Sequence, residues 1–192
     1  MKFIDKQTLQ LDKVLTELDL FVLNFLRILE KHVQYVIVSG YISILFGRAR
    51  ATEDIDLFIQ KIDKQQWAIL YHNLITYGYW CLNTENSSEA YDYLKDGLAL
   101  RFAREKEVIP NFELKFALTP LAKESFHDTL TVKTSQGNFR ISSLERQIAF
   151  KRYYLKSEKD LEDARHIEQI FKDQIDIKKV EAYKKRIDHE TS

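Results

Sequence analysis

The sequence predicts an α/β fold in which helices flank a central mixed β-sheet and a helical bundle follows at the C-terminal end. Strand-length apolar runs alternate with amphipathic helical stretches as far as residue 141, a pattern typical of a sheet covered by helices. From Ser142 the pattern is helical to the end of the chain. We therefore divide the chain into a core domain, residues 1–141, and a C-terminal helical region, residues 142–192, which packs on the core and closes a cleft.

Hydrophobic periodicity predicts the elements of the first half of the chain. Apolar residues recur at helical spacing from Leu11 to Leu29, so we expect a helix from an N-cap at Thr8 to about Lys31. The elements expected after it are a strand (33–39), a short helix (41–46), a strand (54–59), a helix capped by Asp63 (to 77), a short strand (79–82) and a polar loop with at most one helical turn (84–97).

The second half is predicted to contain two hairpins and then helices. Residues 98–104 and 111–117 both alternate and are joined by a short link, which is typical of a hairpin. A short helix opening with Thr119-Pro120 precedes a second hairpin, 129–134 with 138–141. The remaining elements expected are helices at 143–155, 158–171 and 176–189, the last of them a solvated helix.

The composition is that of an ordinary soluble domain. Of the 192 residues 45% are hydrophobic, and 29 basic and 29 acidic residues give a formal net charge of zero, so there is no general electrostatic case for a protein that coats nucleic acid. Cys81 is the single cysteine of the sequence and is expected in the core. The five histidines are not spaced as metal ligands usually are. No apolar run is long enough to span a membrane and the charged N-terminus is unlike a signal peptide, so we expect a cytoplasmic protein with no membrane partner.

The stretch from Val36 to Ile59 carries the residues best suited to chemistry. Asp54 and Asp56 are two apart on a predicted strand, so their carboxylates point to the same side, where a hard divalent metal would compensate their repulsion. Upstream, Ser39-Gly40 ends a strand and begins a helix, a place where free N–H groups suit a phosphate. Taken alone, an acid-x-acid triplet is also typical of a solvated loop that leads into a strand.

Cationic and hydroxyl side chains lie between these two features and complete the candidate site. Arg48 and Arg50 are candidates for binding nucleotide phosphates, with Thr52 beside the carboxylates, although one arginine could instead neutralise Glu53 or Asp54. Together with the paired carboxylates they indicate metal-assisted phosphoryl or nucleotidyl transfer, with a hard divalent metal such as Mg²⁺ (or Mn²⁺) as cofactor.

A third carboxylate lies on the later predicted strand 111–117. In the strand 111–117, Glu113 lies on the face opposite Phe112 and is placed to be a catalytic residue and metal ligand beside Asp54 and Asp56. Asp92 and Asp96 are rivals for this role, and a surface Glu113 paired with Lys115 is an equal alternative.

The C-terminal helices contribute one further candidate cation. Lys151 falls on the apolar stripe of its helix, where a lysine is costly unless its head reaches solvent or meets an anion. Both interpretations stay open, and the second would have Lys151 reach a nucleotide phosphate.

Two segments of the chain resemble the DNA polymerase β-like nucleotidyltransferase superfamily, in particular small enzymes related to antibiotic nucleotidyltransferases and abortive-infection type IV toxins. The first matches a glycine pair, a short helix and an acid-apolar-acid triplet, with Ser39 standing where the family usually has glycine. The matching residues of this segment are Ser39-Gly40-Tyr41, Arg48, Arg50, Thr52 and Asp54-Ile55-Asp56. The second segment matches helical positions after the core, at Lys151, Lys159, Asp160 and Asp163, and the resemblance implies nucleotide binding for Lys151 and Asp160.

The residues and the resemblance together predict a metal-dependent nucleotidyltransferase that moves an NMP from an NTP to a hydroxyl acceptor. The acceptor stays open among an RNA end such as that of tRNA, a protein side chain and a small molecule such as an antibiotic. Resemblance to the toxins implies a toxin–antitoxin role with a cognate antitoxin as partner. The alternatives are a catalytically inactive nucleotidyltransferase-like binding module and an interaction protein that depends on a neighbouring gene product.

Overall fold

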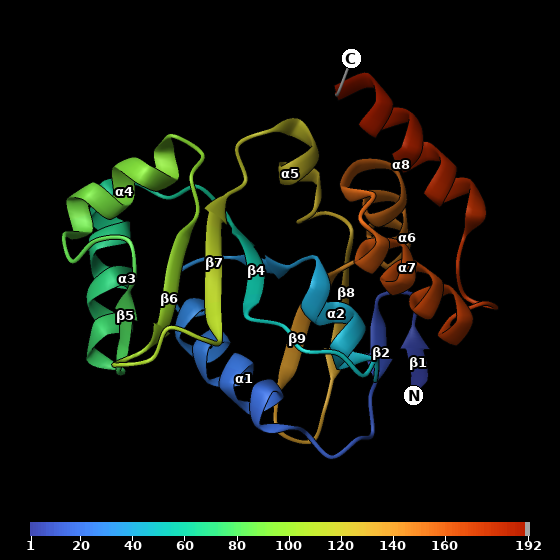
Figure 1. Cartoon of the computed structure of the whole chain (residues 1–192), viewed down its shortest axis with the longest axis horizontal. Coiled ribbons are helices and arrows are strands. Elements are labelled where there is room, and N and C mark those ends of the chain that lie inside the picture. The colour runs from blue at the N-terminus through green and yellow to red at the C-terminus, as the bar shows by residue number, and fades with distance from the viewer. Residues whose placement is uncertain (191–192) are drawn as a thin grey trace.

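A single mixed β-sheet runs through the protein. The structure is a computed structural model and describes residues 1–190. The strand order is β1-β2-β8-β9-β3-β4-β7-β6-β5 (Figure 1). Strand β4 is antiparallel to β3 and parallel to β7, so both kinds of pairing occur. The strands are β1 (Lys2–Asp5), β2 (Thr8–Gln10), β3 (Tyr35–Ile37), β4 (Asp54–Ile59), β5 (Tyr79–Cys81), β6 (Leu100–Arg104), β7 (Asn111–Phe116), β8 (Thr129–Lys133) and β9 (Asn138–Ser142).

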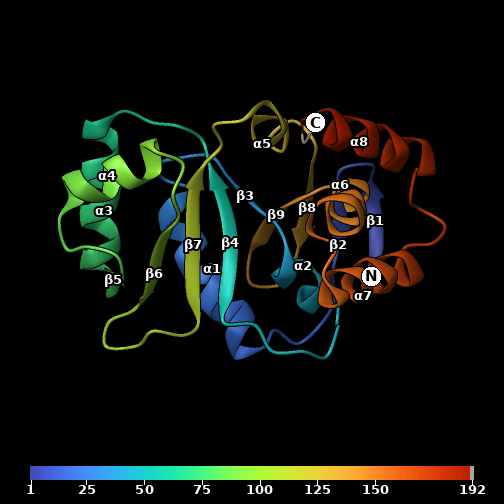
Figure 2. The same cartoon turned by 45° about the horizontal axis from the view of Figure 1, so that its top comes forward.

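Three helices cover one face of the β4-β7-β6-β5 half of the sheet (Figures 1 and 2). Phe25 of α1 stacks on Phe112 of β7 at a centroid distance of 3.8 Å, while rings of α3 and α4 contact Phe102 of β6 and Phe116 of β7. These strand residues share one face, because Phe102 pairs with Phe112 and Phe116 lies four residues further along β7. The helices of this group are α1 (Glu17–Leu29), α3 (Lys64–Thr76) and α4 (Ser87–Lys95).

The remaining helices lie towards the other end of the sheet, where α6, η1, α7 and α8 form a bundle (Figure 2). The ring of Phe171, just after α7, contacts Phe3 of β1 and Phe46, which follows α2. The bundle is therefore joined both to the N-terminal strands and to the short helix before β4. These elements are α2 (Gly40–Leu45), α5 (Pro120–Glu124), α6 (Leu144–Ala149), the π-helical turn η1 (Phe150–Leu155), α7 (Glu158–Ile170) and α8 (Ile177–Glu190).

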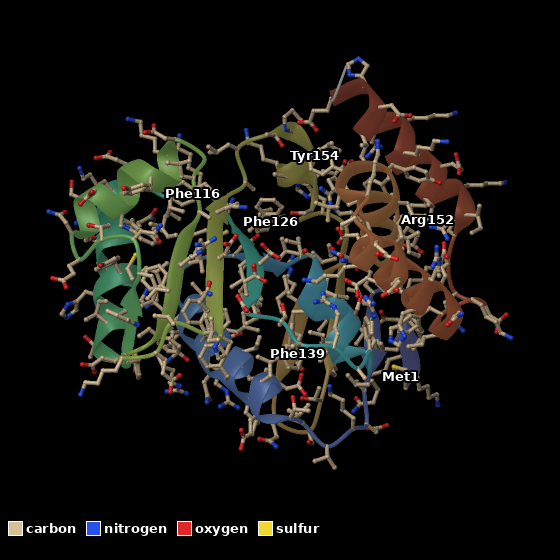
Figure 3. All side chains as sticks on the ribbon, viewed as in Figure 1. Met1, Phe116, Phe126, Phe139, Arg152 and Tyr154 are labelled. Atoms are coloured by element: carbon tan, nitrogen blue, oxygen red, sulfur yellow. The ribbon has the colours of Figure 1, made fainter. Side chains whose placement is uncertain are left out.

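One hydrophobic core connects the two predicted parts of the chain. It extends from Leu9 on β2 through Phe139 on β9 to Ile167 and Ile187 in the C-terminal helices. Figure 3 shows that side chains, that of Phe126 among them, occupy the space which the ribbons leave between β7 and α6. The division at residue 141 stays a prediction. Within residues 1–190, no helix is both long and apolar enough to cross a membrane.

The structure corrects three of the predicted elements. The helix expected from Thr8 is wrong in its first turns: residues 2–10 form the β1–β2 hairpin, and α1 begins after Thr16, which forms a capping box with Asp19. Leu9 is buried because β2 pairs in parallel with β8, a contact that local periodicity does not reveal. The expected polar loop contains the whole of α4, capped by the side chain of Asn86. Helix α8 is amphipathic and not simply solvated, with three buried residues, Val180, Tyr183 and Ile187.

Candidate functional site

Asp54 and Asp56 lie on the face of the sheet opposite α1. Along β4 they alternate with the fully buried Ile55, whose side chain faces the helices. The parallel pairing of β4 with β7 sets Glu113 beside Asp56, and the antiparallel pairing of β7 with β6 sets Arg101 beside Glu113. We call this surface, formed by Asp54, Asp56, Glu113 and Arg101, the carboxylate face. The four charged groups meet there because strand register places them in adjacent positions.

Asp56 is a half-buried carboxylate that forms no ion pair within residues 1–190. Burial, then the charges of Asp54 and Glu113, raise its pKa to about 6, although Lys115 and a hydrogen bond from Ser39 oppose the change. Within residues 1–190, neither Asp54 nor Asp56 takes part in an ion pair, whereas Glu113 takes part in two. The Thr52 hydroxyl donates to the backbone carbonyl of Asp54 at 2.9 Å and lies 3.3 Å from its Oδ1. The paired carboxylates therefore carry negative charge that the described part of the chain leaves largely uncompensated.

Glu113 is already paired with basic side chains. Arg101 donates from Nε at 2.8 Å and from Nη2 at 2.6 Å, both to Oε1, and the Lys115 ammonium lies 3.8 Å from Oε2. In the described residues no group of three or more His, Cys, Asp or Glu side chains is arranged to hold a metal ion. Glu113 as a third ligand would thus require its release from Arg101, and its metal role stays a prediction. Its rivals Asp92 and Asp96 are in or directly after α4, on the opposite side of the sheet.

Ser39 and Gly40 form a tight turn between β3 and α2. Ser39 has φ 64° and ψ −137°, and its side chain makes no capping hydrogen bond to the helix. A Cβ on Gly40 would lie only 2.2 Å from Nη2 of Arg50. Glycine is thus required at position 40 if the Arg50 guanidinium is to rest against the backbone there.

The three predicted phosphate-binding cations converge on Asp163, a fully buried residue of α7. Arg48 donates to its carboxylate, Arg50 donates through Nε at 3.2 Å and Nη2 at 3.1 Å, and Lys151 donates at 2.8 Å. Burial alone would raise the pKa of Asp163, but hydrogen bonds from Lys151, Arg48 and Arg50 outweigh it and hold the pKa below its usual value. Asp163 therefore fixes the loop before β4 to the helical bundle.

Lys151 and its second partner, Asp160, complete this ion-pair cluster. The Lys151 side chain is fully buried and lies 3.2 Å from Oδ1 of Asp160. Its head therefore meets carboxylates inside the protein, so the interpretation in which it extends to solvent is wrong. Contact of Lys151 or Asp160 with a nucleotide stays a prediction.

Sequence reasoning missed the role of one residue of this region and did not identify another. Asp163 matches the family pattern, but its role as the common partner of three cations depends on Arg48 and Arg50, which lie more than 100 residues away in the sequence. Arg101 was not singled out. The available signal was the hairpin itself, since pairing 98–104 with 111–117 places Arg101 directly opposite Glu113.

A second polar region is already occupied by internal pairs. A cavity of about 680 Å³ between β1, β8, α6 and α8 is lined by residues that include Asp128, Glu145 and Lys179. Lys179 lies 2.6 Å from Asp128 and 3.3 Å from Glu145, which ties α8 to α6. Both carboxylates are already paired with Lys179, and we assign the cavity no function.

No protein-family model and no curated protein matches the chain. Among solved structures, the crystal structure of ANT(2'')-Ia in complex with adenylyl-2''-tobramycin has a TM-score of 0.56 at 15% identity, covering 92% of this chain and 100% of that one. The solution structure of the antibiotic-resistance factor ANT(2'')-Ia gives 0.53 at 15% identity, covering 90% and 91%. An antigenic nucleotidyltransferase-like protein from Paracoccidioides brasiliensis gives 0.48 at 16% identity, covering 77% and 73%. The two ANT(2'')-Ia structures confirm the predicted fold: this chain has a nucleotidyltransferase-like fold, a mixed sheet flanked by helices with a C-terminal bundle.

Proposed function

We propose that the protein is a metal-dependent nucleotidyltransferase that moves an NMP from an NTP to a hydroxyl acceptor. The observation that carries the proposal is the carboxylate pair itself. Asp54 and Asp56 share one face of β4, and the pKa of Asp56 is raised to about 6 by burial and by neighbouring carboxylates. A buried carboxylate held beside another without a cation is typical of a site built for one. The nucleotidyltransferase-like fold supports the same reading.

The residues present fit Mg²⁺ or Mn²⁺. Mg²⁺ is usually held by one or two carboxylates together with substrate phosphates, and not by a complete protein cage. Asp54 and Asp56 would hold it, with Glu113 added if Arg101 releases that carboxylate. When bound, the metal supplies charge stabilisation at the reacting phosphate and activates the attacking hydroxyl.

The chain's own residues would bind and orient the nucleotide. Ser39 and Gly40 offer a glycine turn at which backbone can approach the β and γ phosphates closely. Arg48 and Arg50, fixed by Asp163, provide cationic groups beside that turn. Lys151 is fully buried, so its part is to add positive charge behind the arginines.

Two further polar groups would act around Asp54 and the acceptor. Thr52 orients Asp54 through its hydroxyl, and Asp160 holds Lys151 in place. If Glu113 stays paired with Arg101 and does not hold the metal, it is the candidate to accept the proton of the acceptor hydroxyl, and Arg101 keeps its carboxylate in one orientation.

Charges next to the carboxylate pair favour an anionic acceptor. Arg101 and Lys115 flank Glu113 on the carboxylate face, and their side chains are 56% and 41% exposed. The free face carries three carboxylates and two cations, but once a divalent metal offsets Asp54 and Asp56, the two partly exposed cations outnumber Glu113. In that state they would attract a phosphate-bearing molecule such as an RNA end and repel an amine-rich antibiotic. Among the three acceptor classes predicted, we therefore place RNA first, before a protein side chain or a small molecule.

Transfer assays with labelled NTPs test this function and its acceptor. With Mg²⁺ and total tRNA, we expect the wild type to label RNA, and Asp54→Asn or Asp56→Asn to lose at least about a hundredfold in rate. The double variant Arg101→Ala/Lys115→Ala should still bind the NTP but label RNA poorly. Transfer to tobramycin and not to RNA would overturn the acceptor assignment, and absence of both NTP binding and transfer would overturn the proposal.

A toxin role would follow from RNA modification in the cytoplasm. Expression of the wild type should then arrest growth, expression of Asp56→Asn should not, and the neighbouring gene product should relieve the arrest. Arrest that persists in Asp56→Asn would exclude nucleotidyl transfer as its cause.

The second candidate is a nucleotidyltransferase-like binding module without turnover. It is favoured by the pairing of Glu113 with Arg101 and by the absence, within residues 1–190, of a group of three metal-ligating side chains. Tight Mg²⁺-dependent binding of an NTP without transfer to any acceptor would identify this case.

A further inference from the structure

An apolar strip borders the carboxylate face. Phe58 follows Asp54 and Asp56 at the next alternate position of β4, so its ring lies on the same side of the sheet. On β3, Val36 is paired in register with Phe58, and Val38 follows it on the same face. Phe58 and Val38 are half-buried, and none of the three belongs to the hydrophobic core cluster that residues 1–190 form. We call Val36, Val38 and Phe58 the apolar strip, a surface that the main core does not use.

The ring of Phe58 and the glycine turn lie on opposite sides of Asp56. Strand β3 runs antiparallel to β4 and passes Phe58 at Val36. Val38 then donates its N–H to the backbone carbonyl of Asp56 at 3.0 Å, and the turn at residues 39–40 follows at once. Phe58 is two residues from Asp56 in the other direction, about 7 Å along the strand. A single nucleoside can span that distance.

A cation lies beside Phe58 on the neighbouring strand. The parallel pairing of β4 with β7 sets Lys115 directly opposite Phe58. The Lys115 side chain is 41% exposed, and its ammonium lies 3.8 Å from Oε2 of Glu113, which makes a weak pair that leaves the ammonium accessible. An aromatic ring next to an accessible cation is a combination with which proteins bind single-stranded nucleic acid, because bases stack on the ring and the cation meets the phosphate backbone.

We propose that Phe58 is the stacking platform for the terminal base of an RNA acceptor, with Lys115 binding a phosphate of the same strand. The inference rests on the proposed function, which puts the metal at Asp54 and Asp56 and the leaving phosphates at residues 39–40. In phosphoryl transfer the attacking and leaving oxygens are roughly in line. The acceptor hydroxyl therefore approaches from the side of Asp56 that faces Phe58, away from the turn. A base stacked on Phe58 would hold that hydroxyl near the metal.

Steady-state transfer to total tRNA, with Mg²⁺ and the NTP that the wild type binds, tests the platform in Phe58→Leu. Leucine keeps an apolar side chain but offers no ring on which a base can stack. Removal of one stacking ring typically weakens nucleic-acid binding by about 5- to 150-fold, so the KM for tRNA should rise at least about fivefold. The kcat at saturating tRNA and the calorimetric Kd for the NTP should stay within about twofold of the wild type, because the ring binds the acceptor and not the nucleotide.

Phe58→Tyr and Tyr77→Leu are the matched controls. Phe58→Tyr keeps a ring that stacks and should have the wild-type KM. Tyr77 is 56% exposed and directly follows α3, on the side of the sheet opposite the carboxylate face, so Tyr77→Leu removes an aromatic ring elsewhere and should leave the KM unchanged. A ring that served only the fold would behave differently: Phe58→Leu would then lose kcat, NTP affinity and tRNA affinity together, and that result would overturn the platform.

The stacked partner is tested with two tRNA transcripts that differ only in whether the 3′-terminal nucleotide carries its base. Loss of the base should raise the KM of the wild type about as much as Phe58→Leu does. It should raise the KM of Phe58→Leu hardly further, since the ring and the base act as a pair.

The failure of the platform can be told apart from that of the proposed function. Additive effects of base and ring, or a wild-type KM in Phe58→Leu, would overturn the platform while RNA labelling by the wild type upheld the function. A weaker NTP affinity in Phe58→Leu, with the tRNA KM unchanged, would assign the ring to the base of the NTP and also overturn the platform. If the wild type neither bound an NTP nor labelled RNA, the proposed function would fail and the platform with it.

Discussion

Replacing Asp56 by asparagine should make the metal-free protein more stable near neutral pH. Burial and the charges of Asp54 and Glu113 raise the pKa of Asp56 from its ordinary 3.8 to about 6. Between these two pH values the folded carboxyl binds more protons than the unfolded one, so folding stability falls as the pH rises through this window. Above about pH 6 the full cost of the folded, ionised carboxylate is present. Asparagine has nearly the same shape and carries no charge.

The size of the effect follows from the pKa. At 1.36 kcal/mol per pKa unit, the difference between 3.8 and about 6 corresponds to at most about 3 kcal/mol. Near pH 8, Asp56→Asn should therefore exceed the wild type by up to about 3 kcal/mol in free energy of unfolding. Near pH 4.5, the advantage should shrink to about 1 kcal/mol, because the folded wild-type carboxyl is then mostly protonated.

Urea denaturation at both pH values, in the presence of a chelator, measures this difference directly. Adding Mg²⁺ should raise the midpoint of the wild type and leave that of Asp56→Asn nearly unchanged, since only the wild type offers the carboxylate pair. If Asp56→Asn were less stable than the wild type near pH 8, or if the difference between them did not depend on pH, the electrostatic argument for a cation site would be refuted.

The remaining predictions concern the ion-pair cluster, the glycine turn and the third carboxylate. Asp163→Asn should lower the free energy of unfolding by about 3–5 kcal/mol in urea titrations, because it leaves buried cations uncompensated. Because hydrogen bonds lower the pKa of Asp163, the effect of pH on its contribution to stability is opposite to that for Asp56. The stability that ionised Asp163 contributes is present above pH 3.8 and is lost as the pH falls through the pKa of the folded state. A loss of stability in Asp163→Asn that grew towards acid pH would contradict this reasoning. Gly40→Ala should push Arg50 away from Asp163, because the added Cβ would meet the Arg50 guanidinium. In a double-mutant cycle with Arg50→Ala, the changes in free energy of unfolding should be coupled by at least about 0.5 kcal/mol. Simply additive changes would argue against the contact between Gly40 and Arg50. Glu113→Gln should change stability little, because its partner Arg101 is 56% exposed, but should slow nucleotidyl transfer at least about tenfold; unchanged transfer would remove Glu113 from the site.

Local patterns predicted the parts of the structure that depend on neighbouring residues. The alternation of Asp54, Ile55 and Asp56 set both carboxylates on one face, because side-chain direction in a strand has a period of two. Turn residues and short links predicted both hairpins, β6–β7 and β8–β9. Alternation also put Glu113 on the face opposite Phe112, but its place beside Asp56 depends on the pairing of β7 with β4, which the local pattern did not contain.

The parts that escaped prediction depend on contacts between distant segments. Strand β2 has three residues and gains its place by parallel pairing with β8, so the helical stripe that begins at Leu11 gave no sign of a strand before it. The buried position of Asp163 could not be predicted either, since α7 reads as an amphipathic helix with a polar residue near its stripe. Its burial depends on cations supplied by the loop before β4 and by η1.

The most direct test of the proposed site is calorimetric titration of the wild type and of Asp54→Asn/Asp56→Asn with each of the four NTPs, with and without Mg²⁺. We predict that the wild type binds at least one NTP only when Mg²⁺ is present, and that the double variant, though folded and at least as stable, does not. Equal binding by both proteins, or wild-type binding that is independent of Mg²⁺, would contradict a metal-dependent nucleotide site at Asp54 and Asp56.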